Sequence, residues 1–115
     1  MPRIIEIRSY NLKPDTLAEF DRIARSGVRQ LLDRHGTDVV AARPSLAEEN
    51  TYYLIRAYAN VEERETSQAA FYGGSAWRDG PRDAILGCID SYATIVIEAD
   101  EATIDGLRDR APASF

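Results

Sequence analysis

Apolar residues recur along this chain at two spacings, one typical of strands and one typical of helices. Four segments, residues 3–10, 38–43, 51–58 and 92–98, are rich in β-branched and aromatic residues and are too short for helix cores. The polar residues at 44–50 predict an exposed turn, and so a hairpin between the second and third segments. Each of the four segments is therefore expected to form a strand.

The spacing becomes helical between residues 17 and 35, where apolar residues recur every three or four positions. Thr16 and Glu19 match a capping box at the start of this stretch. Gly36 suits its end, because glycine readily adopts the left-handed conformation that closes many helices. These features predict one helix of about five turns.

A second helical region follows the third strand. Asn60 and Glu63 resemble another capping box before a short helix at 61–72. The double glycine at 73–74 ends it, and residues 77–88 are expected to form a helical elbow rather than a loop. The order β-α-β-β-α-β predicts an α+β, ferredoxin-like fold with strand order 4-1-3-2.

The pattern also divides the chain into two parts. Residues 1–98 carry all the predicted strands and form the ferredoxin-like domain. Residues 99–115 are mostly polar, with Ile104, Leu107 and Phe115 as their large apolar residues. They are expected to be a tail, with a short helix docked on a partner.

Alternation along the first and third strands sorts their side chains onto two faces of the sheet. The more apolar set, expected to receive the helices, is Ile5, Ile7, Tyr53, Ile55 and Ala57. The opposite face mixes apolar, tyrosine and arginine residues, and interface cores are enriched in tyrosine and arginine. This face is predicted to be a sheet-to-sheet homodimer interface, made by Ile4, Glu6, Arg8, Tyr52, Leu54 and Arg56. A solvated face with incidental aromatic residues is the alternative.

Glu6, Arg8 and Arg56 would lie on neighbouring central strands, close enough to form ion pairs. Two nearby arginines lower the pKa of a carboxyl group, whereas a general base needs a raised one. Ion pairing is therefore the preferred role of Glu6, with a general base as the alternative.

Composition narrows the choice of partners and location. The chain has 115 residues and a formal net charge of −5, which argues against nucleic acid and anionic membranes as partners. Cys88 is the only cysteine, so no internal disulfide forms. The first residues lack the apolar stretch of a signal peptide, so a cytoplasmic location is expected.

Neither a metal nor a nucleotide cofactor is expected. His35 is the only histidine, and no second histidine or cysteine stands ready to complete a zinc site with it. The carboxylates show no metal-coordinating spacing, and Gly73-Gly74 lacks the context of a phosphate-binding loop.

Several short motifs, in order along almost the whole chain, resemble those of the NIPSNAP family. They are Glu6-Ile7-Arg8-Ser9-Tyr10, Leu12-Lys13-Pro14, Phe20, Arg34-His35-Gly36, Tyr58 to Arg64, Trp77-Arg78 and Gly80-Pro81-Arg82. Asp15 departs from the glycine expected there, a change that affects only a turn. The resemblance implies a dimeric α/β barrel, in which two ferredoxin-like sheets pack face to face. The wider superfamily includes cofactor-free monooxygenases, lactone isomerases and haem-binding enzymes, which use a pocket between sheet and helices.

The segment from Phe71 to Arg78 is a candidate lid over such a pocket, since it combines large aromatic residues, a double glycine and a cation. The candidate ligand-binding residues are Tyr10, Tyr58, Phe71, Trp77 and Arg78. The candidate catalytic residues are His35 or Tyr72, as the proton shuttle, and Arg82 or Arg78, as the oxyanion stabiliser. Ordinary core packing is the preferred role of Phe71 and Trp77, with a pocket wall as the alternative. A structural histidine is the preferred role of His35, with a proton shuttle and then a haem ligand as the alternatives.

Three functional hypotheses follow. The first is a homodimer of NIPSNAP type that holds a small apolar or aromatic molecule, without a settled reaction. The second is a cofactor-independent monooxygenase or isomerase. The third is a non-catalytic protein-interaction module, which would have an exposed apolar patch in place of an enclosed cavity.

Overall fold

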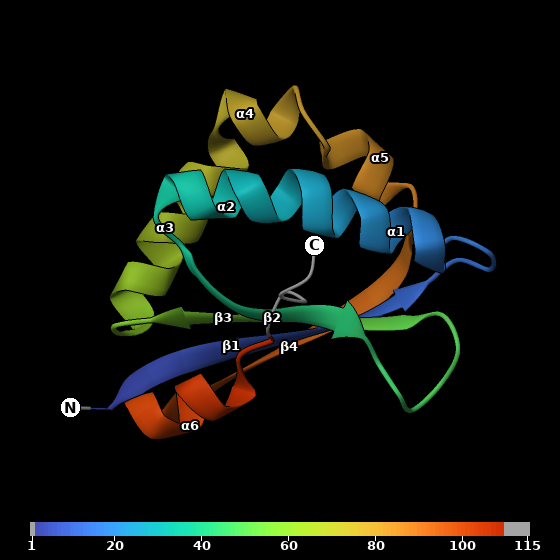
Figure 1. The fold of residues 1–115 in the computed structure, drawn as a ribbon. Helices are drawn as coiled ribbons and strands as arrows, with labels where there is room; N and C mark the ends of the chain where they lie inside the picture. Colours follow the sequence, from blue (N-terminus) through green and yellow to red (C-terminus); the bar gives the residue numbers. More distant parts are fainter. Residues whose placement is uncertain (1, 110–115) are drawn as a thin grey trace, which may run out of the picture.

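The computed structural model describes residues 2–109 as one antiparallel sheet with helices packed on both faces (Figure 1). The helices that precede the last strand lie over one face, and the helix that follows it lies on the other. The elements in chain order are β1 (Arg3–Leu12), α1 (Leu17–Ile23), the π-helical η1 (Ala24–Val28), α2 (Arg29–His35), β2 (Asp38–Pro44), β3 (Thr51–Tyr58), α3 (Val61–Gly73), α4 (Ser75–Arg78), α5 (Arg82–Leu86), β4 (Ile89–Ala99) and α6 (Glu101–Leu107).

The strand order is β2-β3-β1-β4, with every neighbouring pair antiparallel. This confirms the predicted α+β fold and the predicted strand order. In the register of the two central strands, Glu6 lies opposite Arg56 and Tyr10 lies opposite Tyr52. Tyr10 also lies opposite Tyr92 on the edge strand β4. The strand residues of the candidate site therefore come from three adjacent strands.

The first helical region confirms the predicted span but differs in detail. Helices α1 and α2 are joined through the π-helical η1, which apolar spacing does not predict. The Thr16 side chain does not cap α1; its hydroxyl donates to the carbonyl of Lys13 at 2.7 Å. Gly36 ends α2 with a φ of 87°, as predicted.

The start of α3 is confirmed as a reciprocal cap. Asn60 Oδ1 accepts a hydrogen bond from the Glu63 amide at 2.8 Å, and Glu63 Oε2 accepts one from the Ala59 amide at 2.9 Å. The predicted elbow is helical, but it is divided into α4 and α5 by a turn at 79–81.

The two faces of the sheet are the reverse of the prediction. The side chains of Glu6, Tyr52 and Arg56 are almost fully buried beneath helices of the same chain. The predicted interface set Ile4, Glu6, Arg8, Tyr52, Leu54 and Arg56 therefore cannot contact a partner sheet. The error has a physical cause. The charged residues on this face neutralise one another and bond to α3, so their charge does not indicate exposure.

The tail contains the predicted short helix, but α6 docks on this chain's own sheet. Ile104 is fully buried against Ile5 and Val40. Beyond the helix, the Asp109 amide donates to the Val40 carbonyl at 3.0 Å. Residues 110–115 of the predicted tail lie outside the described residues. None of the helices within 2–109 is long and apolar enough to cross a lipid bilayer.

Candidate functional site

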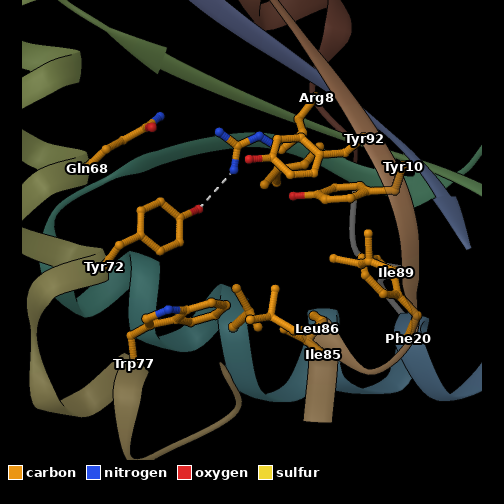
Figure 2. Close-up of a pocket in the computed structure, with 12 residues that line it drawn as sticks. Arg8, Tyr10, Phe20, Gln68, Tyr72, Trp77, Ile85, Leu86, Ile89 and Tyr92 are labelled. Carbon is orange, nitrogen blue, oxygen red and sulfur yellow. Dashed lines mark hydrogen bonds between the residues drawn. The ribbon is translucent and has the colours of Figure 1, made fainter. Parts of the chain in front are cut away.

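A cavity of about 380 Å³ lies between the helix-covered face of the sheet and helices α3, α4 and α5 (Figure 2). Its floor comes from β1, β3 and β4, and its walls come from the helices. The residues that line it are Arg8, Tyr10, Phe20, Val28, Leu54, Gln68, Tyr72, Trp77, Ile85, Leu86, Ile89 and Tyr92. Most of them are apolar or aromatic, as is typical of small-molecule pockets.

The short turn between α4 and α5 brings Trp77 and Ile85 to the same wall. Gly80 lies in this turn, and a Cβ atom there would meet the Ala76 carbonyl oxygen at only 2.4 Å. Only glycine therefore permits this close backbone approach. Gly80 therefore determines the position of the apolar wall, although it does not line the cavity.

The opposite end of the cavity is polar. Figure 2 shows the Arg8 guanidinium and the hydroxyl groups of Tyr10 and Tyr72 gathered there, away from Trp77. The Tyr72 hydroxyl accepts hydrogen bonds from Arg8 Nη1 at 3.3 Å and from Arg56 Nη1 at 2.8 Å. A phenol oxygen that accepts two bonds still has one proton to donate. No group within residues 2–109 is seen to accept that proton.

Arg8 is held in place by three neighbours. Its Nε donates to the Thr94 hydroxyl at 3.3 Å, its Nη1 donates to Tyr72, and its guanidinium lies 5.1 Å from the ring centre of Tyr92. Among the lining residues Arg8 alone carries a charge. It therefore sets the electrostatic character of the cavity.

Glu6 lies behind this polar end and anchors it. Arg56 donates to Glu6 Oε1 through Nε and Nη2, while Arg64 and Gln68 donate to Glu6 Oε2. Arg8 Nη2 lies 3.7 Å from Glu6 Oε1. We call Glu6, Arg8, Arg56 and Arg64 the buried ion cluster. The predicted ion pairing of Glu6 with Arg8 and Arg56 is confirmed.

The ion pairs of this carboxyl group argue against a general-base role for Glu6. Burial alone would raise its pKa, but the charge and hydrogen bonds of Arg56, the bond from Gln68 and the charge of Arg8 outweigh burial and lower the pKa to about 2. Tyr10 shifts the other way, because burial raises its pKa to about 12 although Arg8 opposes the shift. Near neutral pH, Glu6 is an anion and Tyr10 is a hydrogen-bond donor.

Of the predicted site residues, the structure brings Tyr10, Tyr72 and Trp77 to the cavity. Phe71 lies one layer behind, with its ring centre 5.1 Å from that of Tyr72 and 5.7 Å from that of Trp77. Tyr58 is also behind the wall, where its hydroxyl accepts from Gln68 at 3.2 Å. Phe71 and Tyr58 support the site without lining it.

The remaining predicted residues lie outside the cavity. Arg78 and Arg82 are exposed, and Arg82 pairs with Asp83 at 3.0 Å. His35 lies at the exposed end of α2, with Nε2 3.1 Å from the Ser67 carbonyl oxygen. The proposed roles of His35 and Arg82 in one common site with Tyr72 are therefore wrong in geometry, because helical spacing cannot tell which end of a helix approaches the sheet.

Sequence reasoning placed Arg8 and Leu54 in an interface, and it missed the lining residues Phe20, Val28, Gln68, Ile85, Leu86, Ile89 and Tyr92. A signal for Tyr92 existed, because it starts the predicted last strand and antiparallel pairing sets it beside Tyr10. No comparable signal marks Gln68, a polar residue on a mostly polar helix.

The cavity suits binding and hydrogen-bond donation more than metal chemistry. No cluster of three or more histidine, cysteine or acidic side chains within the described part of the chain could hold a metal ion. The lining contains neither a carboxylate nor an imidazole, and its polar groups are one guanidinium, three phenols, one amide and the indole N–H of Trp77.

The chain matches one protein family and is similar to several solved structures. The NIPSNAP family model matches residues 5–94. A NIPSNAP family protein from Agrobacterium tumefaciens is similar in structure, with 12% sequence identity and a TM-score of 0.77 over 86% of this chain and 87% of that one. An uncharacterized NIPSNAP-like domain protein from Burkholderia xenovorans has 18% identity and a TM-score of 0.75 over 86% of each chain.

A proposed antibiotic biosynthesis monooxygenase from Caulobacter crescentus is also similar, with 17% identity and a TM-score of 0.62 over 86% of this chain and 89% of that one. At such identities these structures show a shared fold and no shared reaction. A comparison with the curated proteins finds no match. The family model, in contrast, spans β1 to β4 almost completely, including every strand that lines the cavity. The chain belongs to the NIPSNAP family.

Proposed function

We propose that this protein binds a small apolar or aromatic molecule in the cavity beneath α3, α4 and α5, and that it does so as a homodimer. The observation that carries the binding proposal is the cavity itself. Its volume of about 380 Å³ is within the range of small-molecule sites, and its apolar walls meet a few convergent polar groups at one end.

The dimer proposal rests on the face of the sheet turned away from α1 to α5, of which α6 covers only one part. Between them β1, β3 and β4 place fourteen residues on that face, and the one charged residue among them is Arg3, at the end of β1, which pairs with Asp38 and Glu101. By contrast, 29% of the whole chain is charged. Ile95 and Ile97 on this face are 57% and 47% exposed. A solvated sheet face normally carries charged residues, whereas interface cores are depleted of them. A second copy of the same sheet is the occupant that the family resemblance favours.

Trp77 provides a direct test of binding, because it is the only tryptophan and it lines the cavity. Titration with small aromatic alcohols or acids should change its fluorescence saturably. Val28→Phe should weaken the response, since Val28 borders the cavity and the added ring would fill it. The matched control is Val61→Phe, a change on the exposed start of α3. Absence of any response, with the protein folded, counts against the binding proposal.

Light scattering after size-exclusion chromatography tests the dimer. The wild-type protein should have the mass of two chains at micromolar concentration, and Ile95→Glu should have the mass of one. Val61→Glu adds the same charge at a side chain that is 47% exposed, and it should leave the dimer intact. A wild-type monomer, or equal behaviour of both variants, would refute this interface.

A cofactor-independent monooxygenase or isomerase is the second candidate. Two observations favour it: the Tyr72 hydroxyl lies between two guanidinium groups, and the fold is similar to that of the Caulobacter crescentus protein. Oxygen uptake with hydroquinone substrates tests the monooxygenase form. Activity that Tyr72→Phe abolishes without weakening ligand binding would support it. If no ligand binds at all, a non-catalytic interaction module becomes the better description.

A further inference from the structure

We infer that the bound molecule carries an anionic oxygen group, such as a carboxylate, on its apolar or aromatic body, and that Arg8 and Tyr72 hold this group at the polar end of the cavity. The inference rests on the proposed binding function and adds the charge and orientation of the ligand.

The first argument is the charge balance of the buried ion cluster. Arg8, Arg56 and Arg64 face one carboxylate, Glu6, so the cluster has two positive charges in excess. Within residues 2–109, Glu6 alone forms salt bridges with these arginines. Buried charges are costly unless they are paired. An anion in the adjoining cavity would offset part of the excess.

The second argument concerns the position of each cation. The Arg56 side chain is 1% exposed, donates three hydrogen bonds to Glu6 and Tyr72, and does not line the cavity, so it cannot itself reach a ligand. The Arg8 side chain is 13% exposed and lines the cavity. Arg8 is therefore the cation through which the excess charge can contact a bound molecule.

The third argument is the supply of hydrogen-bond donors. A guanidinium has five N–H groups, and Arg8 uses two of them in hydrogen bonds to Thr94 and Tyr72. Its contact with Glu6, at 3.7 Å, is too long for a hydrogen bond. Tyr72 has its own proton to donate, because its oxygen already accepts from two guanidinium groups. Several donors therefore meet at one place where no carboxylate lines the cavity.

The surroundings strengthen this preference. Trp77, Ile85 and Leu54 form walls of low polarity, in which an ion pair is less screened than in water. The same electrostatics disfavour a cationic ligand. A neutral alcohol could accept the hydrogen bonds but would not balance the charge. The cavity should therefore rank ligands of one shape as anion, then alcohol, then cation.

Three probes of one shape test this ranking: hydrocinnamate, hydrocinnamyl alcohol and phenylpropylammonium. Their affinities are measured at neutral pH by Trp77 fluorescence and by calorimetry. We expect hydrocinnamate to bind about tenfold more tightly than the alcohol, since hydrogen bonds to charged groups are stronger than neutral ones. The ammonium compound should bind most weakly.

Variants then assign the preference to Arg8. Arg8→Gln should bring the acid and the alcohol to within about threefold of each other, since the ion pair is lost and alcohol binding changes little. Arg34→Gln removes one positive charge from an exposed position on α2, and it should keep the wild-type preference. Arg8→Lys keeps the charge and should retain part of the preference for the acid. That result would show that the charge of residue 8, and not its packing alone, favours the acid.

The outcomes separate this inference from the function on which it rests. If the alcohol or the ammonium compound binds as tightly as the acid, the binding proposal stands and the anion inference fails. If none of the probes binds, both fail. If Arg8→Gln keeps the wild-type preference, Arg8 is not the anion-binding group. Should Arg8→Gln not fold, the comparison of the three probes on wild-type protein still decides the charge of the ligand.

Discussion

Arg56 donates two hydrogen bonds to a single carboxylate oxygen of Glu6, and both side chains are almost completely buried. The two residues face each other across β1 and β3. The second oxygen of Glu6 accepts from Arg64 and Gln68 on α3, so one carboxylate joins two strands to the helix that carries Tyr72. The polar end of the cavity therefore depends on the same contacts that hold α3 on the sheet.

Glu6→Gln should destabilise the protein strongly. The variant keeps the shape of the side chain but leaves three guanidinium groups without their counter-charge. Breaking a buried pair in this way costs about 3–5 kcal/mol, which urea unfolding would measure. Glu19→Gln is the control, because Glu19 pairs with Arg22 on the surface of α1 and such pairs contribute little. Equal stability of the two variants would contradict a structural role for Glu6.

Stability should also depend on pH through Glu6. Its folded pKa of about 2 lies below its ordinary value of 4.5, so its contribution is fully present above the ordinary value and is lost as the pH falls toward the folded one. The stability difference between wild type and Glu6→Gln should therefore shrink on going from about pH 6 to about pH 3. Unfolding titrations of both proteins at each pH measure it. A difference that stays constant or grows in acid would show that Glu6 is not paired as described.

The strands and their order could be predicted from sequence because local composition determines them. Residues 51–58 are a clear example, since β3 has the predicted bounds. The choice of covered face could not be predicted in the same way. On the covered face β1 carries Ile4, Glu6, Arg8 and Tyr10, and two of these four residues are charged. Charged residues suggest an exposed face until their partners on β3 and α3 are known.

The residues at the cavity also divide into those that a local sequence pattern predicts and those that only the three-dimensional structure reveals. Trp77 and Tyr72 were predicted because large aromatic residues beside a double glycine stand out in a sequence. Gln68 and the turn at Gly80 act through geometry, since one bridges to Glu6 and the other needs close backbone contact with Ala76. Neither has a local pattern that would reveal it. Long-range contacts, rather than residue type, decide which side chains reach the cavity.

His35→Gln should leave ligand binding nearly unchanged. His35 is exposed and outside the cavity, and its ring contacts Phe71 at 5.5 Å between ring centres. Effects of such separate sites are nearly additive, so probe affinity should stay within about twofold of wild type. The Trp77 fluorescence titration measures it, with Val28→Phe as the variant that does weaken binding. A large loss of affinity in a folded His35→Gln protein would reveal coupling between the end of α2 and the cavity.

Asp109→Asn should loosen the chain after α6. The Asp109 carboxylate accepts two hydrogen bonds from Arg29, each at 2.9 Å, and one from the Ala42 amide at 2.8 Å. Burial raises its pKa, but the bonds from Arg29 and Ala42 outweigh burial and hold the pKa below its usual value. Loss of the carboxylate should cost about 1–3 kcal/mol in urea unfolding.

Hydrogen exchange locates the effect, because the Ala42 amide on the edge strand β2 should lose protection first. Asp105→Asn is the matched control. Asp105 pairs with Arg108 at 3.1 Å, but its side chain is 66% exposed, so its removal should leave Ala42 protected. If both variants expose Ala42 equally, a general weakening of the segment explains the result. If only Asp109→Asn exposes it, the carboxylate of Asp109 is what secures the end of the described chain to the sheet.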